Sequence, residues 1–574
     1  GVAALETGLA QQAQQLCENL ADRDLIRPAE SDRFAFRHIL IQEVAYNTLP
    51  RTERARLHAE AGRWVESTSE GREVAVAEIL AFHYREAAVL GAALDPKSED
   101  TARAKASAGR WLLKAADVAA AAAATPEAVR HIRAAMDFVD PSLRPSLHER
   151  IGDMTGGDSG LEDYRLALEL YRECEAPVDD QLRALAGMLM VTTRWAGSVG
   201  DRPSEEWMDG LRARGRDLLA RAVDPRSIGR FLAADAFYPF WLQGVRQITT
   251  DELERAEADA KRSLQIATEL GDFDLASLAL DAVGGIATSV SDWARARETA
   301  VARIAFEDKL GLYERLDAHS MVAWMSYLMG DLETADRDSA EMVARLLPGQ
   351  APYPALHLFA WRAATLYTLG RWDEAAAAFW RAIEAWHDAG SHAAGYGLRG
   401  FTVGLDIGWA RGDSRLIGAA SDAMESVLNR FPADHINRRS VSYLRGESGF
   451  TSDDPFLTRA FVSEGVEKRL CLASDRREQL PAEILEAGLV KALEARMPLV
   501  EAQVRRARGL AYRDATELTA ALAIWDRIGA VPHQGRARAE RGLIMGDRKE
   551  TEAGLAILTK LGDVNYVDRF ATGA

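Results

Sequence analysis

The sequence predicts an all-α protein: a right-handed superhelical solenoid of helical hairpins that follows a smaller N-terminal segment. Long stretches rich in Ala, Leu, Arg and Glu carry apolar residues at three- and four-residue spacing, which is typical of amphipathic helices. Alternating strand patterns are almost absent. Breaks between the helical stretches recur at a nearly constant interval. These observations favour one long repeat array over several unrelated globular domains in the 574 residues.

Residues 1–70 differ from the rest and are predicted to form a separate N-terminal domain. Phe34-Ala35-Phe36 follows a polar break at residues 31–33 and predicts a short β-ribbon arm. A helix is expected through residues 41–46, and a long helix is expected to begin after Leu49-Pro50. Residues 71–574 are assigned to the repeat domain.

The breaks in the repeat domain form two interleaved series. The breaks of one series start at Asp292, Asp331, Arg371 and Asp413, at steps of 39, 40 and 42 residues. The other, at steps of 40, 38 and 41 residues, falls at Gly271, Gly311, Gly349 and Gly390. Near the end the interval tightens to 33 residues, from Asp514 to Asp547 and from Gly529 to Gly562. Two series with one shared period indicate a two-helix unit repeated in tandem.

Residues 366–383, LYTLGRWDEAAAAFWRAI, form the clearest single unit, and they resemble a tetratricopeptide repeat. Gly370 and Trp372 lie at the expected turn. Small side chains at Ala375 and Ala382 allow neighbouring helices to approach, and Phe379 fills the groove between them. This pattern predicts the architecture strongly but says almost nothing about a ligand.

Residues 34–66, FAFRHILIQEVAYNTLPRTERARLHAEAGRWVE, resemble the winged-helix-to-repeat junction of the signal-transduction ATPases with numerous domains, the STAND family. In that family a nucleotide-binding module precedes the winged helix and a tetratricopeptide-like sensor follows it. Bacterial members often add a class III adenylate or guanylate cyclase domain, or a LuxR-type DNA-binding domain. The resemblance implies that residues 1–70 include a winged-helix remnant, and we expect the chain to be part of a longer protein.

The same resemblance implies a role for His38, with Arg37 beside it. In the family, a winged-helix histidine contacts the phosphates of the bound nucleotide and helps to hold the closed, inactive state. ATP or ADP would then be bound by the upstream module, and no cofactor is expected in this chain, which lacks the GxxxxGK[ST] phosphate loop. The alternative is that His38 only satisfies backbone groups in the β-arm.

Aromatic side chains offer the only plausible ligand surface in the repeats. Phe237, Tyr238 and Trp241 crowd one segment, and further tryptophans, including Trp324 and Trp361, follow over the central repeats. A concave solenoid face could use such rings to bind a peptide or small molecule. The alternative is packing between hairpins. Two segments rich in Gly, Ser, Pro and Asp, residues 194–206 and 444–455, are predicted to be loops that act as a lid or contact a partner.

Composition and charge exclude several function classes. The formal net charge is −17, which disfavours direct nucleic-acid binding, and no apolar run is long enough to predict a membrane span. Residues 251–345 carry 20 acidic and 10 basic residues, either as a face for a basic partner or as a solvated surface. No zinc spacing or nucleophile motif occurs, so neither a metal site nor enzymatic activity is predicted. Three widely separated cysteines favour a reducing, cytoplasmic location.

Three functions remain open at this point. The first is a sensor of an effector protein, peptide or small molecule that controls the upstream nucleotide-binding module by favouring an open state. The second is the regulatory half of a nucleotide cyclase. The third is a passive scaffold that binds partner proteins along its repeats.

Overall fold

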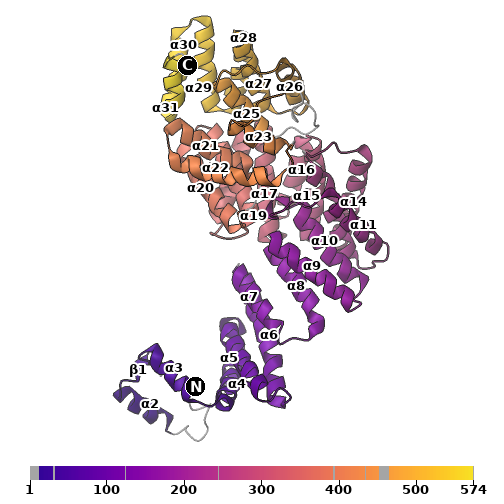
Figure 1. Ribbon diagram of the computed structural model, residues 1–574, viewed down its shortest axis with the longest axis vertical. Coiled ribbons are helices and arrows are strands. Elements are labelled where there is room, and N and C mark those ends of the chain that lie inside the picture. The colour runs from indigo at the N-terminus through magenta and orange to yellow at the C-terminus, as the bar shows by residue number, and fades with distance from the viewer. Residues whose placement is uncertain are drawn as a thin grey trace. The chain divides into compact units, whose positions relative to one another are not determined.

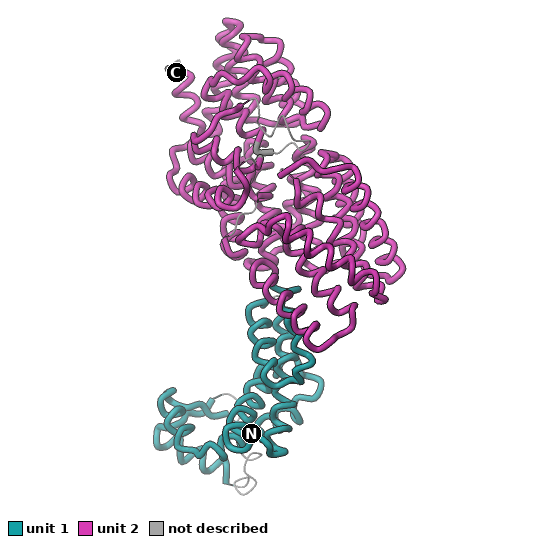
Figure 2. Tube along the Cα trace, turned by 45° about the vertical axis from the view of Figure 1, so that its right-hand side comes forward, with its two compact units in different colours: residues 1–155 teal, residues 156–574 magenta. Residues whose placement is uncertain are grey.

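The computed structural model describes seven stretches of the chain: residues 12–29, 33–122, 124–243, 245–391, 395–433, 435–451 and 464–572. The chain divides into two compact units, residues 1–155 and residues 156–574 (Figure 2). Each unit is built almost entirely of antiparallel helices joined by short turns (Figure 1). The predicted all-α repeat fold is therefore confirmed.

The first unit begins with the predicted β-ribbon. Strands β1 (Ile26–Ala29) and β2 (Arg33–Phe36) pair antiparallel, with Ile26 opposite Phe36. The helices of this unit are α2 (Ala13–Asp22), α3 (Ile39–Thr48), α4 (Arg51–Thr68), α5 (Glu73–Leu94), α6 (Glu99–Ala121), α7 (Thr125–Ala135) and α8 (Arg144–Thr155), with a 3₁₀ turn η2 (Pro141–Leu143) before α8. The ribbon prediction is confirmed, whereas its origin in a winged helix stays a prediction.

Helices α4 and α5 pack as a hairpin. A Cβ atom on Gly62 would lie 2.9 Å from Cζ of Tyr84, so the missing side chain lets the two helices approach. Leu80, Trp111 and Leu112 continue the buried core from α5 into α6. The domain boundary predicted near residue 70 falls in the turn between α4 and α5, inside this compact unit, and as a boundary between domains it stays a prediction.

The second unit holds the remaining hairpins (Figure 1). Its helices are α9 (Gly157–Glu173), α10 (Val178–Thr193), α11 (Glu205–Leu219), α12 (Pro225–Ala236), α13 (Tyr238–Leu242), α14 (Thr250–Leu270), α15 (Phe273–Ser289), α16 (Trp293–Ile304), α17 (Leu312–Leu328), α18 (Leu332–Arg345), α19 (Pro352–Thr368), α20 (Trp372–Asp388), α21 (Leu398–Arg411), α22 (Ser414–Arg430) and α23 (Ile436–Leu444). The helices after residue 463 are α25 (Glu464–Asp475), α26 (Ala482–Glu494), α27 (Pro498–Ala511), α28 (Ala515–Ile528), α29 (Val531–Met545), α30 (Arg548–Leu561) and α31 (Val564–Thr572). The 3₁₀ turns are η3 (Ala196–Ser198), η4 (Glu307–Lys309) and η5 (Gly395–Gly397).

The predicted breaks coincide with helix ends, and the residue types explain why. Asp292 and Asp331 are the N-caps of α16 and α18, and each accepts a hydrogen bond of 3.2 Å from the backbone N–H three residues on. Such caps satisfy an otherwise unpaired donor and stabilise a helix by about 1 kcal/mol. Gly271 and Gly529 end α14 and α28 at φ +65° and +74°, a conformation that glycine adopts without strain.

The clearest repeat packs as its sequence predicts. Trp372 and Phe379 are buried, and Trp372 stacks on Tyr367 with ring centroids 5.3 Å apart. A Cβ atom on Gly404 of α21 would lie 2.6 Å from the Phe379 ring, so Phe379 occupies the groove between α20 and α21. Packing between hairpins accounts for both aromatic residues.

The last repeats also pack against earlier ones, which the periodicity does not predict. A Cβ atom on Gly370, in the α19–α20 turn, would lie 2.9 Å from Cβ of Val531 in α29. Arg411 donates a hydrogen bond of 3.2 Å to the backbone carbonyl of Leu561. Within the second unit, the repeats therefore contact more than their nearest neighbours in sequence.

Candidate functional site

The residues that the STAND resemblance implies lie in the first unit and are exposed. His38 is the N-cap of α3, and its Nδ1 accepts a hydrogen bond of 3.2 Å from the backbone N–H of Leu40. Arg37 forms an ion pair of 2.6 Å with Asp24. The backbone-capping role considered for His38 thus occurs, and its contact with a nucleotide stays a prediction.

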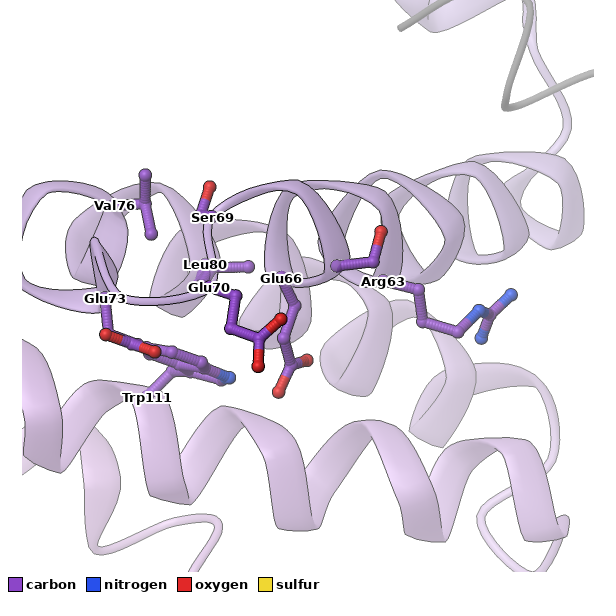
Figure 3. A pocket seen from close by; sticks show the side chains of 9 residues that line it. Arg63, Glu66, Ser69, Glu70, Glu73, Val76, Leu80 and Trp111 are labelled. Carbon is purple, nitrogen blue, oxygen red and sulfur yellow. The ribbon is translucent and has the colours of Figure 1, made fainter.

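A second feature of the first unit is an acidic pocket of about 350 Å³ at the α4–α5 turn. Glu66, Glu70 and Glu73 extend from this turn towards the helix that carries Trp111 (Figure 3). Glu66 already accepts hydrogen bonds from Tyr84 Oη and Arg110 Nη2, both at 2.6 Å. Glu73 accepts one of 3.0 Å from a backbone N–H, and these backbone hydrogen bonds lower its pKa. Two of the three carboxylates therefore already have partners within the fold.

The structure brings two of the predicted aromatic residues to one cavity in the second unit. Trp241 of α13 and Trp324 of α17 both line a cavity of about 100 Å³ and are only 6% and 4% exposed. The ends of α10 and α22, the turn η5 and the start of α23 complete the walls. Segments that are distant in the sequence thus converge on one small cavity. We call it the aromatic cavity.

The other predicted aromatic residues support this cavity without lining it. Tyr238 stacks on Trp241 with centroids 5.6 Å apart, and Trp361 stacks on Trp324 at the same distance. Phe237 packs into the core formed with α14 and α15. Because buried rings in stacked pairs are held rigidly, Trp241 and Trp324 are fixed in position before any ligand arrives. Tyr238, Trp361 and Phe237 pack in the core and do not line this cavity, and ligand contact stays a prediction for all five aromatic residues.

Arg194, on one wall of the aromatic cavity, belongs to a buried ion cluster. Its guanidinium donates to Asp281 at 2.7 Å, to Glu314 at 2.5 Å and to Asp317 at 2.6 Å. Arg303 of α16 donates to Asp281 at 2.8 Å and to Asp317 at 2.6 Å. Two guanidinium groups and three carboxylates tie α10, α15, α16 and α17 together. We call this set the matched cluster, because each charge in it lies against opposite charges.

The matched cluster contains one carboxylate more than it contains guanidinium groups, and this excess affects the pKa of Asp281. Burial, together with the neighbouring carboxylates Asp317 and Glu314, raises the pKa of Asp281 to about 6, although Arg303 and Arg194 oppose this. Asp317 behaves oppositely: burial works against its ionisation, but the two guanidinium groups lower its pKa to about 2. The cluster therefore approaches neutrality when Asp281 is protonated.

Two further arginines line the aromatic cavity, and neither has such partners. Arg202 stacks over Trp241, with its Cζ 4.2 Å from the ring centroid, and it donates a hydrogen bond of 2.7 Å to the Trp241 carbonyl. Arg430 is 8% exposed, and its Nη1 donates a hydrogen bond of 3.3 Å to the Gly200 carbonyl. Its Nη2 is buried and has no hydrogen-bond partner among the described residues. Among the described residues, neither guanidinium forms an ion pair at close range, although Glu205 acts on Arg202 and Asp158 and Asp201 act on Arg430 from farther away. We call Arg202 and Arg430 the unmatched pair.

Burial has the largest effect on the unmatched pair, although Glu205 opposes it at Arg202 and Asp158 and Asp201 oppose it at Arg430. Burial lowers the pKa of Arg202 to about 10, and burial together with the positive charge of Arg202 lowers the pKa of Arg430 to about 10. Both groups still carry their charge at neutral pH. Two adjacent, partly desolvated cations are costly to keep unless an anion offsets them.

Several residues of the cavity wall also carry buried hydrogen-bond donors. The indole nitrogens of Trp241 and Trp324 and the hydroxyl of Tyr396 are buried and have no hydrogen-bond partner among the described residues. An indole N–H can only donate, and a guanidinium has no acceptor atom. The cavity therefore presents positive charge, hydrogen-bond donors and aromatic surface, which together suit an acceptor-rich anion.

Sequence reasoning found the rings of this site but missed its charges. Arg202 lies in the predicted loop 194–206, and Arg430 ends α22, far along the chain. That loop is largely packed, since Arg194 and Trp195 are buried in it. The part of the other predicted loop at residues 452–455 lies outside the described residues. No local pattern marks an arginine as lacking a partner, because the partners are supplied by tertiary contacts.

A wider groove lies among the last repeats. It has a volume of about 510 Å³ and is lined by residues of α25, α26, α27, α29 and α31. Tyr512 and Leu543 at its rim are exposed. Asp475 and Glu540 in its wall form ion pairs of 2.5 Å with the buried Arg506. This groove thus combines an apolar rim with charges that already have partners.

Within the residues that the structure describes, there is no group of three or more His, Cys, Asp or Glu side chains suited to hold a metal ion. Over the same residues, no helix combines the length and the apolar character needed to cross a bilayer.

Comparisons with known proteins find only distant likenesses. No protein-family model and no curated protein matches the sequence. Among solved structures, the chain is similar to the APC/C hetero-tetramer Cut9-Hcn1, with 13% identity over 91% of this chain and 98% of that one and a TM-score of 0.27. It is also similar to a circular tandem repeat protein, with 14% identity over 92% and 99% of the two chains and a TM-score of 0.11. Values this low carry no argument about function.

Proposed function

We propose that the chain is the sensor arm of a signalling ATPase and that its effector binds in the aromatic cavity. The helical-repeat architecture supports a binding role, because such repeats offer extended surfaces rather than a catalytic centre. The resemblance of residues 34–66 to the STAND junction supports control of an upstream module that binds ATP or ADP. Arg37 and His38, which are exposed, are the residues we assign to the contact with that module.

The observation that carries the proposal is the way the cavity is assembled. Its walls come from the ends of α10 and α22, from α13 and α17, and from η5 and α23. A bound effector would contact all of them and would favour the arrangement in which they converge. Differential binding to one arrangement is what shifts a population between states. Opening of the nucleotide module would follow from that shift.

The test uses the full-length parent protein and measures its nucleotide turnover. Removing residues 156–574 deletes one compact unit and leaves the other intact. We expect this deletion to change turnover, and we expect Trp241→Ala in the intact parent to abolish the response to effector-containing extract while the basal rate persists. Unchanged turnover after the deletion would refute the proposal. Formation of cyclic nucleotide in place of inorganic phosphate would identify the regulated module as a cyclase.

A passive scaffold is the second candidate, and the groove among the last repeats favours it. Its volume of about 510 Å³ and its exposed Tyr512 and Leu543 suit an apolar side chain of a partner protein. For a scaffold, Tyr512→Ala would weaken partner binding, and nucleotide turnover would not respond to the partner. A sensor shows the reverse dependence.

A further inference from the structure

We propose that the aromatic cavity binds a small organic anion whose carboxylate or phosphate group lies against Arg202 and Arg430. The proposal deepens the function proposed above and rests on it, since it names the chemical class of the effector. It depends on the charge balance of the cavity wall, on the donors around it and on its size.

The charge balance is the first argument. Arg194 is surrounded by three carboxylates at 2.5 to 2.7 Å, so it has no charge left to offer a ligand. Arg202 and Arg430 line the same cavity, and neither forms an ion pair at close range among the described residues. A guanidinium pairs with a carboxylate or phosphate through two parallel hydrogen bonds. An anionic ligand would therefore supply the close partner that both guanidinium groups lack among the described residues.

The donors are the second argument. Nη2 of Arg430 is buried without a partner, and so are the indole nitrogens of Trp241 and Trp324 and the hydroxyl of Tyr396. Buried donors are nearly always satisfied in proteins, and an unsatisfied group needs an explanation. The acceptor oxygens of an anion would satisfy any of these donors that turn toward it. A cation offers no acceptor to the guanidinium and indole donors.

The size and the aromatic surface are the third argument. A volume of about 100 Å³ is too small for a nucleotide, and because the cavity is partly open it suits the anionic group of a small ligand whose ring or short apolar chain extends along the wall. Trp241 and Trp324 are held by stacking on Tyr238 and Trp361, with both centroid distances at 5.6 Å, so they form rigid apolar walls. The ring of the ligand would lie against these walls, while its anionic end would reach the unmatched pair.

The experiment is isothermal titration calorimetry of the whole chain with four probes. Benzoate and phenyl phosphate combine a ring with the two candidate anionic groups, benzamide is the neutral counterpart of benzoate, and inorganic phosphate has no ring. We expect benzoate or phenyl phosphate to bind at least tenfold more tightly than benzamide. The preferred one of the two identifies the anionic group. Inorganic phosphate should bind more weakly than phenyl phosphate because it makes no aromatic contact.

Arg430→Gln and Arg202→Gln are the test variants, and Arg445→Gln is the matched control. Arg445 follows the end of α23, the helix whose start lines the cavity, but it does not line the cavity itself, and it pairs with Glu447 at 2.8 Å. We expect each test variant to lose at least tenfold in affinity for the anion, with the melting temperature unchanged or raised. The control should bind as the natural chain does. A lowered melting temperature together with undiminished binding would assign the two arginines a structural role and overturn the proposal.

The outcomes separate this proposal from the function on which it rests. If benzamide binds as tightly as benzoate, the anion proposal fails while a ligand site in the cavity stands. If no probe binds, and Trp241→Ala leaves the effector response of the parent intact, both fail. If no probe binds but Trp241→Ala abolishes that response, only the small-anion proposal fails.

Discussion

Arg194 and Arg202 belong to the same stretch of chain and line the same cavity, but their surroundings differ completely. Arg194 belongs to the matched cluster, in which it shares three carboxylates with Arg303. Arg202 belongs to the unmatched pair, in which it and Arg430 hydrogen-bond, within the described part of the chain, only to backbone carbonyls. Arg194 and Arg202 are the same residue type and lie close together in the sequence, so the main difference between them is the charge of their partners.

The difference suggests how a structural charge can be told from a binding charge. Burying an arginine is costly, and a fold can offset that cost with its own carboxylates. The matched cluster does so, and it joins four helices in doing so. The unmatched pair has no close ion pair among the described residues, and the more distant Glu205, Asp158 and Asp201 compensate it only in part, so a bound anion would reduce the remaining cost. An arginine without a partner is therefore more informative about function than an arginine with several.

The largest expected effect comes from breaking the matched cluster. Arg303→Met would leave three buried carboxylates to one guanidinium, and we expect it to lower the free energy of unfolding by about 3 to 5 kcal/mol. Urea unfolding followed by circular dichroism, with hydrogen exchange of α15 to α17, measures the loss globally and locally. Arg297→Met, on the same helix, removes a partly exposed ion pair with Asp331 and should cost less than about 1 kcal/mol. Equal losses for the two variants would contradict the structural role of the cluster.

A smaller effect should appear in the pH dependence of the same cluster. The pKa of Asp281 is raised to about 6 in the folded protein, so between pH 4 and 6 the folded state binds a proton that the unfolded state has released. Its contribution to stability is therefore present below pH 4 and is lost as the pH rises to 6, by roughly 3 kcal/mol. Asp281→Asn should flatten this part of the stability profile. Below pH 4, protonation of Asp317, whose pKa is lowered, changes the stability in the opposite direction.

Parallel profiles for the natural chain and Asp281→Asn would show that Asp281 is ionised throughout that range. In that case the cluster would carry a net negative charge, and its carboxylates would be less well balanced than the geometry indicates.

The architecture could be predicted because its signals are local. Asp292 and Gly271 cap helices through contacts within a few residues, and such contacts leave a periodic trace in the sequence. The approach of Val531 to Gly370 could not be predicted, because it joins repeats that are not neighbours. Period alone defines the repeating unit but not how distant repeats pack against each other.

The candidate site could be predicted only in part, for the same reason. Aromatic crowding near Trp241 indicated a ligand surface, and Trp241 does line the cavity. Trp361, of the same residue type, is fully enclosed behind Trp324 and serves packing. The acidic excess of residues 251–345 predicts a charged surface, but three of these carboxylates form ion pairs inside the fold, in the matched cluster: Asp281, Glu314 and Asp317. Burial and pairing are tertiary properties, so composition cannot distinguish these cases.

The smallest expected effect gives the most direct test, because its sign changes with the ligand. Arg430→Met removes a buried charge that lacks an ionic partner, so without any anion we expect it to raise the free energy of unfolding by about 1 kcal/mol. Saturating benzoate, or phenyl phosphate if that probe binds better, should stabilise the natural chain but not the variant, so that the natural chain becomes the more stable of the two. Urea unfolding of both proteins with and without the anion measures this reversal. A variant that is already less stable without the anion, and that gains as much from the anion as the natural chain does, would contradict the claim that Arg430 is a binding charge.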